Sequence, residues 1–226
     1  MKKIYIIVAF LMICLLAGCQ STGSTTTEQP STNPSPAETE ENTPTPSPNP
    51  TPDTTETAVP QREDADFRNA KWGDDKETVI EYEADVDLIE SDDALVGEAN
   101  AGGYDTLVIY YFDDDKLYET AYAFSEVLNF SNAGQYIPVY NSLKETLTTK
   151  YGTPIMDRII PMESQDLIDY AGEASALEYG YVTYVAQWET ETTDIMMGMS
   201  AINFEINLVI IYTDKNYEPD INDSGL

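Results

Sequence analysis

Residues 180–212 read GYVTYVAQWETETTDIMMGMSAINFEINLVIIY, and no other part of the chain says as much about its fold. Apolar and polar residues alternate there in three runs, at 180–190, 193–202 and 203–212. Strict alternation is typical of antiparallel strands that bury one face. The residues expected on the buried face are Val182, Tyr184, Ala186, Trp188, Ile195, Met197, Met199, Ala201, Phe204, Ile206, Leu208, Ile210 and Tyr212.

Upstream of these strands, three segments have helical character. Asp74 is the expected N-cap of a short helix that runs to about Glu83. A second and longer helix is predicted over 134–150, where apolar residues recur at three- and four-residue spacing: Tyr136, Tyr140, Leu143 and Leu147. A third helix is expected over 164–178, with an interruption at Gly172.

Two β-rich runs lie between the first two helices. Residues 106–112 and 117–124 flank the acidic sequence at 113–116, which predicts a hairpin with a four-residue loop. Further extended segments are expected at 86–91 and 155–161.

The order of helix, strands, helix and strands predicts an α+β domain, with an antiparallel sheet and helices packed on one face. The same order allows two α-β-β-like halves, at 72–124 and 134–212. This acidic domain is expected to span 63–217, followed by a flexible tail at 218–226.

The N-terminus has the order of a secretory signal. Lys2 and Lys3 precede an apolar run from Ile4 to Leu16, and small residues follow. The apolar run is shorter than the roughly 20 residues of a comfortable membrane span. The last four residues of the pattern are Leu16-Ala17-Gly18-Cys19.

This LAGC sequence resembles the lipobox of bacterial lipoproteins. The resemblance implies that residues 1–18 are a signal peptide that is removed, and that the thiol of Cys19 receives a diacylglyceryl group carrying fatty acyl chains such as palmitate. Two acyl chains hold a protein stably on a bilayer. The chain is therefore expected at the cell membrane, lipid-anchored on the extracytoplasmic face.

A polar segment separates Cys19 from the domain. Residues 20–60 contain twelve Thr, five Ser and nine of the chain's thirteen Pro, without any aromatic residue. Such a composition cannot bury enough apolar surface to offset the entropy of ordering. We therefore expect residues 19–62 to form a disordered tether.

A second resemblance rests on the sequence at 67–73, which reads FRNAKWG. Together with the YYF…KLY hairpin at 110–118 and the KYGTP turn at 150–154, it resembles uncharacterised extracytoplasmic domains of Gram-positive bacteria. The resemblance covers most of the domain and implies a fold rather than an activity. Trp72 is expected as a buried anchor beside a helix start. The two-half layout is also similar to that of β-lactamase-inhibitory proteins, which is an analogy of fold alone.

Charge and composition exclude several functions. Residues 61–226 carry 9 basic and 35 acidic residues, a net charge of 9 − 35 = −26, so nucleic acid is not an expected partner. The chain has no His, and its two Cys lie at positions 14 and 19. Ser-His-Asp and Cys-His nucleophiles and His-based zinc sites are therefore excluded. No GxGxxG or P-loop sequence occurs.

Carboxylates and tyrosines are the remaining candidates. Asp113, Asp114 and Asp115 form the densest acidic cluster, and calcium takes such oxygen ligands. A polar hairpin turn accounts for the same three residues, because Asp favours turns. Fifteen tyrosines in the domain offer either core filling or an aromatic platform.

These observations predict a non-catalytic, lipid-anchored binding or interaction module at the cell surface. Its expected partner is a cell-wall component, a glycan or a protein, in addition to the membrane that holds its lipid. Two alternatives stay open: a hydrolase of envelope glycans that uses paired carboxylates, and a calcium-responsive structural surface protein. No cofactor other than calcium is expected.

Overall fold

The structure of this protein is a computed structural model, and it describes residues 62–218. The predicted signal peptide at 1–18, and nearly all of the tether at 19–62 and the tail at 218–226, lie outside the described residues.

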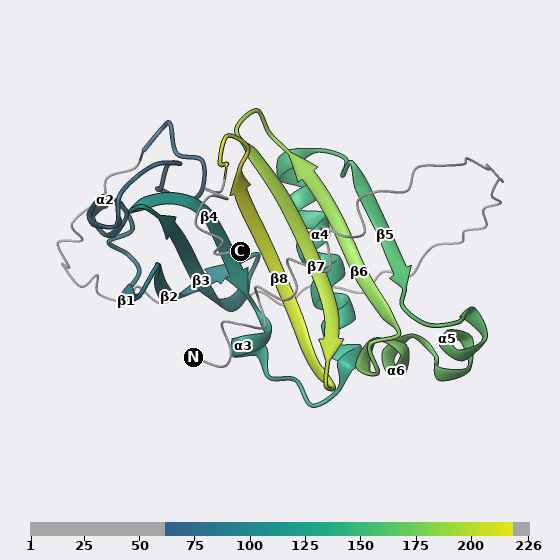
Figure 1. Cartoon of the computed structure of the whole chain (residues 1–226). Coiled ribbons are helices and arrows are strands. Elements are labelled where there is room, and N and C mark those ends of the chain that lie inside the picture. Colours follow the sequence, from purple (N-terminus) through teal and green to yellow (C-terminus); the bar gives the residue numbers. More distant parts are fainter. Residues whose placement is uncertain (1–61, 219–226) are drawn as a thin grey trace, which may run out of the picture. The chain divides into compact units, whose positions relative to one another are not determined.

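The predicted α+β architecture is confirmed (Figure 1). Eight antiparallel strands form one sheet in the order β1-β2-β3-β4-β8-β7-β6-β5. The strands are β1 (Ile89–Ser91), β2 (Ala94–Ala101), β3 (Tyr104–Asp113), β4 (Lys116–Ala123), β5 (Met156–Pro161), β6 (Val182–Glu189), β7 (Thr193–Ile202) and β8 (Glu205–Asp214).

One long helix covers the second half of the sheet. In Figure 1, α4 lies behind β6, β7 and β8. Its buried residues pack against a core that includes Tyr184, Met197 and Leu208. The described helices are α2 (Lys76–Tyr82), α3 (Ser125–Leu128), the 3-10 helix η1 (Ala133–Gln135), α4 (Tyr136–Tyr151), α5 (Gln165–Ala171) and α6 (Glu173–Glu178).

The two halves of the sheet are alike in topology. Each half has a helix followed by four strands that pair in sequence order, with α5 and α6 inserted between β5 and β6 in the second half. The last strands of the halves, β4 and β8, pair antiparallel at the centre. Strand β2 was not predicted, because its sequence ALVGEANA contains Gly97 and lacks alternation. A Cβ at Gly97 would lie 2.4 Å from Val86 Cγ1, so the residue is a glycine because the 86–88 segment crosses there.

Two predicted details near the first helix and the hairpin are wrong. Asp75 caps α2 and accepts a bond from the Thr78 N–H, because the Asp74 carboxylate is occupied by Arg62. The β3–β4 loop has two residues rather than four. Its residues Asp114 and Asp115 have φ values of 46° and 59°, a conformation that Asp tolerates and that two-residue hairpin turns require.

The burial pattern also departs from strict alternation at the centre of the sheet. Residues Leu208–Tyr212 of β8 are all buried, so both faces of this strand are covered. A continuous apolar run is typical of a strand buried on both faces. Phe204, which was expected on the buried face, is 68% exposed because it lies in the two-residue β7–β8 turn.

Candidate functional site

The candidate site is a pocket at the β5 edge of the sheet, called here the α5–α6 pocket. Strands β5 and β6 form its floor, and the two short helices form its wall. Figure 1 shows α5 and α6 at the end of the sheet farthest from α2. The pocket has a volume of about 500 Å³, and it is lined by Ile159, Pro161, Gln165, Ile168, Asp169, Gly172, Glu173, Ala176, Val182 and Tyr184.

The local sequence explains how the wall forms. Gly172 adopts a φ of 74°, ends α5 and precedes the first residue of α6. Its N–H donates to the Ile168 carbonyl and closes the α5 end. Because the chain turns sharply at Gly172, residues of both short helices can line the pocket, which a single straight helix would not allow.

The polar groups of the pocket lie among apolar ones. The Tyr184 hydroxyl donates to Glu173 Oε1 at 3.1 Å. Burial raises the pKa of the Tyr184 phenol, and the bond to Glu173 raises it further. Tyr184 therefore stays protonated and holds the Glu173 carboxylate in place. Asp169 and Glu173 themselves are exposed.

A second tyrosine backs the floor of the pocket. The Tyr140 ring of α4 meets the Tyr184 ring edge-on, with ring centroids 5.4 Å apart. Its hydroxyl is buried and has no hydrogen-bond partner among residues 62–218. The Tyr184 ring in the floor of the pocket is therefore packed against a second aromatic ring.

Chemically, this arrangement suits an organic cation. Ile159, Ile168 and Val182 offer apolar surface, while Asp169 and Glu173 offer negative charge at the rim. The pocket was not predicted, because the spacing of residues does not show how α5 and α6 fold back on β5 and β6. The interruption at Gly172 was the one local signal of it.

Asp113, Asp114 and Asp115, the candidate calcium ligands, lie at the opposite half of the sheet. Asp113 Oδ2 accepts from the Tyr217 hydroxyl at 2.9 Å, and Asp115 Oδ1 accepts from the Lys76 N–H at 3.4 Å. Asp114 is exposed in the turn between them. The first and last of the three carboxylates therefore meet different partners.

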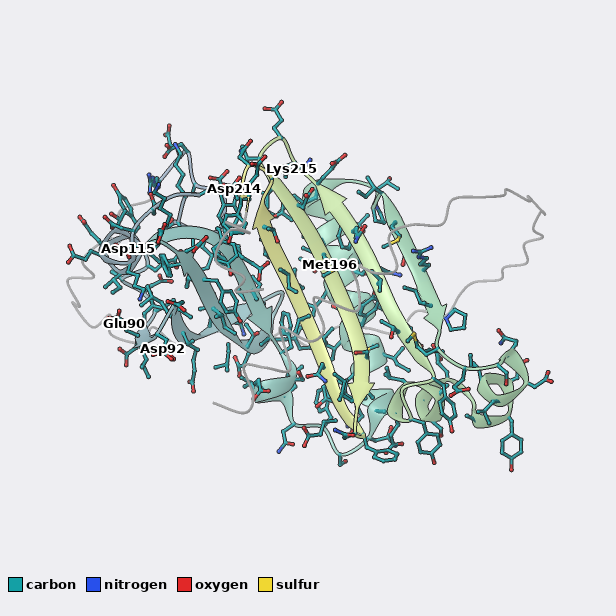
Figure 2. All side chains as sticks on the ribbon, in the orientation of Figure 1. Glu90, Asp92, Asp115, Met196, Asp214 and Lys215 are labelled. Atoms are coloured by element: carbon teal, nitrogen blue, oxygen red, sulfur yellow. The ribbon has the colours of Figure 1, made fainter. Side chains whose placement is uncertain are left out.

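A lysine sits among the acidic turns in this half. Lys76 Nζ lies 3.0 Å from Glu90 Oε1 and donates to the Asp92 carbonyl at 2.6 Å. Figure 2 shows Glu90, Asp92 and Asp115 at the same end of the molecule. Within the described part of the chain, no three His, Cys, Asp or Glu residues are grouped to hold a metal. The calcium site stays a prediction.

The FRNAKWG motif at 67–73 packs against the sheet. The Phe67 ring packs against Tyr110, Tyr122 and Tyr212, with ring centroids 4.8 to 5.8 Å apart. Trp72 is half-buried, and its Nε1 donates to Thr193 Oγ1 at 3.0 Å. The motif therefore ties the start of the domain to the sheet.

A buried carboxyl that sequence reasoning missed is Glu119 on β4. It is 9% exposed, and its Oε2 accepts from the Thr213 hydroxyl at 3.2 Å. Burial raises its pKa to about 7, although the Thr213 bond lowers it. Glu119 does not line the α5–α6 pocket.

Cys19, the predicted lipidation site, lies outside the described residues. None of the helices between residues 62 and 218 combines the length and apolar character that a membrane crossing needs. Comparisons of the chain with protein-family models, curated proteins and solved structures found no match.

Proposed function

We propose that this protein is a lipid-anchored, cell-surface binding module that turns nothing over, and that its ligand occupies the α5–α6 pocket. The observation that carries the proposal is the pocket: about 500 Å³ with an apolar floor and two carboxylates at its rim. That volume falls in the range of roughly 300–1,000 Å³ that small-molecule sites have.

The ligand class follows from the lining. An apolar body would bury against Ile159, Ile168 and Val182, and a positive charge would meet Asp169 and Glu173. The net charge of −26 over residues 61–226 attracts cations to the whole domain. The preferred ligand is therefore an organic cation with an apolar body.

Binding is favoured over glycan hydrolysis by the exposure of the rim. A carboxyl that acts as general acid near neutral pH has its pKa raised by an apolar, water-shielded site. Asp169 and Glu173 are both exposed, which suits electrostatic attraction of a ligand. Glu119 has the raised pKa, about 7, but lies elsewhere on the sheet.

The anchor part of the proposal rests on the sequence. The basic, apolar and small residues that end in Cys19 support lipidation, and the 41 residues from 20 to 60 would separate the domain from the bilayer. Cys19→Ala should release the protein from membranes or stall its processing. A variant that is cleaved normally and stays as membrane-bound as the parent would contradict the anchor.

Titration with alkylammonium ions tests the pocket. Methyl NMR signals of Ile159, Ile168 and Val182 should shift, with affinity that rises with chain length because apolar burial gives about 0.8 kcal/mol per CH₂. Glu173→Gln should weaken binding. Asp166→Asn, an exposed carboxylate of α5 outside the lining, should not.

Alcohols of the same chain length as the alkylammonium ions separate the contribution of the positive charge to binding from that of the apolar chain. An alcohol that binds as tightly as the ammonium ion of equal length would contradict the role of the rim carboxylates. Shifts confined to residues outside the pocket would contradict the site itself.

A further inference from the structure

Three aromatic side chains, called here the aromatic ledge, lie together where α6 meets the β7–β8 turn: Tyr179, Tyr181 and Phe204. The Tyr179 ring centroid lies 5.5 Å from that of Tyr181 and 5.9 Å from that of Phe204, the latter pair at 89°. Tyr179 is 52% exposed and Phe204 68%. None of the three lines the α5–α6 pocket.

The backbone under Phe204 is strained. Asn203 and Phe204 form the two-residue turn between Ile202 and Glu205, with φ values of 53° and 67°. Such a turn prefers Asn followed by Gly, because a Cβ in the left-handed region is unfavourable. Phe204 occupies the glycine position and leaves most of its ring in water. Burial of the ring within the domain does not explain why it is there.

A second backbone adaptation fixes the other side of the ledge. Gly180 lies between the two tyrosines with a φ of 72°, and a Cβ there would lie 3.0 Å from the Ala201 carbonyl oxygen. The α6–β6 loop is therefore held close against the β7–β8 turn. This close approach keeps Tyr179 in contact with Phe204.

The size of the ledge suits a small ligand better than a protein. If each ring offers about 200 Å² of surface, the exposed fractions of Tyr179 and Phe204 amount to roughly 240 Å². A stable protein complex needs about 800 Å² on each partner. One or two sugar rings, whose C–H faces pack on aromatic faces, match the smaller area.

The negative charge around the ledge limits the class of sugar that can bind. Glu178 and Glu205 adjoin the ledge in sequence, and residues 61–226 carry a net charge of −26. Anionic glycans would be repelled. We propose that the aromatic ledge binds neutral or cationic sugar rings of a surface glycan, as a site separate from the α5–α6 pocket.

The test uses the purified protein and two probes, the neutral tetramer of N-acetylglucosamine and its deacetylated, cationic counterpart. Calorimetry should detect binding of at least one tetramer, with NMR shifts at the ledge rings. Phe204→Gly and Tyr179→Ala should each weaken binding about tenfold or more, as loss of a binding hot spot does. Tyr170→Ala removes a tyrosine that is 90% exposed outside the ledge and should leave binding unchanged.

Thermal unfolding separates binding from folding. Phe204→Gly should melt at the same temperature as the parent or higher, since glycine relieves the strained turn. The proposal is overturned if the parent binds neither tetramer, if both ledge variants bind as the parent does, if Tyr170→Ala weakens binding equally, or if Phe204→Gly lowers the melting temperature. Phe204→Gly should leave the affinity of the α5–α6 pocket for alkylammonium ions unchanged. The proposal for the ledge and the proposal for the pocket are therefore tested independently.

Discussion

Arg68, in the segment before α2, and Phe204, in the β7–β8 turn, share an unusual backbone conformation. Among residues 62–218, they are the two residues other than Asp, Asn and Gly in the left-handed region, with φ values of 50° and 67°. Arg68 Nε donates to Glu83 Oε2 at 2.6 Å, and the Asn69 N–H donates to the other carboxylate oxygen at 2.9 Å. Phe204 is 68% exposed and contacts Tyr179 edge-on.

The two residues therefore differ in whether the fold compensates their strain. At Arg68 the fold itself supplies the compensation, because Glu83 is completely buried and needs a cation. At Phe204 the domain supplies little, and the ring faces outward. Strain without an internal explanation is a reason to look for a ligand. The fold explains the left-handed conformation of Arg68, whereas the turn that carries Phe204 is where we propose that a ligand binds.

The largest expected effect is at the motif end. Arg68→Ala leaves Glu83 buried without its cation and should lower the free energy of unfolding by about 3–5 kcal/mol. Urea denaturation at pH 7 measures it. Lys71→Ala is the control, because its ion pair with Asp64 is exposed and screened by solvent. A loss at Arg68 no larger than this control would remove the contrast with Phe204.

Glu119 and Glu83 are both buried carboxyls. Glu83 is paired with the guanidinium of Arg68, whereas Glu119 accepts a hydrogen bond from the neutral Thr213 hydroxyl. The pKa of Glu119, about 7 in the fold, exceeds the ordinary value of about 4.3. The folded state thus holds a proton that the unfolded state releases, and stability should fall as pH rises from about 4 to 7. Above pH 7 the penalty should be complete.

Glu119→Gln removes this penalty. The free energy of unfolding of the variant should exceed that of the parent by about 2–3 kcal/mol at pH 8. The two values should be equal near pH 4, where both side chains are neutral. Denaturation at a series of pH values measures the difference. A pH-independent difference between variant and parent would contradict the raised pKa.

Phe204→Gly should have a smaller effect of opposite sign to that of Arg68→Ala. Relief of the left-handed conformation should raise the free energy of unfolding by about 0.5–1 kcal/mol, less what the partial ring contact contributes. Phe204→Ala keeps the strained backbone and serves as the matched control. If Phe204→Gly destabilises as Phe204→Ala does, the ring stabilises the fold and the contrast with Arg68 disappears.

The smallest effect is expected in the β3–β4 turn. Asp115 has a φ of 59°, which Asp tolerates at a small penalty, so Asp115→Gly should stabilise the domain by a few tenths of a kcal/mol. Chemical denaturation of the variant and the parent measures this difference.

The predicted calcium site is tested by chemical denaturation of the parent with calcium and with a calcium chelator. A calcium-dependent gain that Asp113→Asn abolishes would support the predicted calcium site.

Local sequence predicted the elements whose signal is local. The apolar spacing of Tyr136, Tyr140, Leu143 and Leu147 found α4, and Gly152 ends it as expected. The strand β2 escaped because Gly97 and Glu98 break its alternation, and Gly97 is set by a crossing segment rather than by β-propensity.

The candidate sites depended on how successive elements fold back on one another. Phe204 continued the alternation of β8 and was expected inside, yet the two-residue turn places it outside. The pocket needed the packing of α5 and α6 against β5, which no spacing of residues encodes. The acidic turn was visible in sequence, but the position of Lys76 among its carboxylates and carbonyls was not.

The most direct test is NMR mapping of the purified protein with an alkylammonium ion and with whichever N-acetylglucosamine tetramer, neutral or deacetylated, binds in calorimetry, each added alone. We expect the alkylammonium ion to shift signals of Ile159, Ile168 and Val182, and the tetramer to shift those of Tyr179 and Phe204, while signals around Arg68 stay in place. Shifts centred on α2 and the Asp113–Asp115 turn, or no shift with either probe, would contradict a binding role for the α5–α6 end of the sheet.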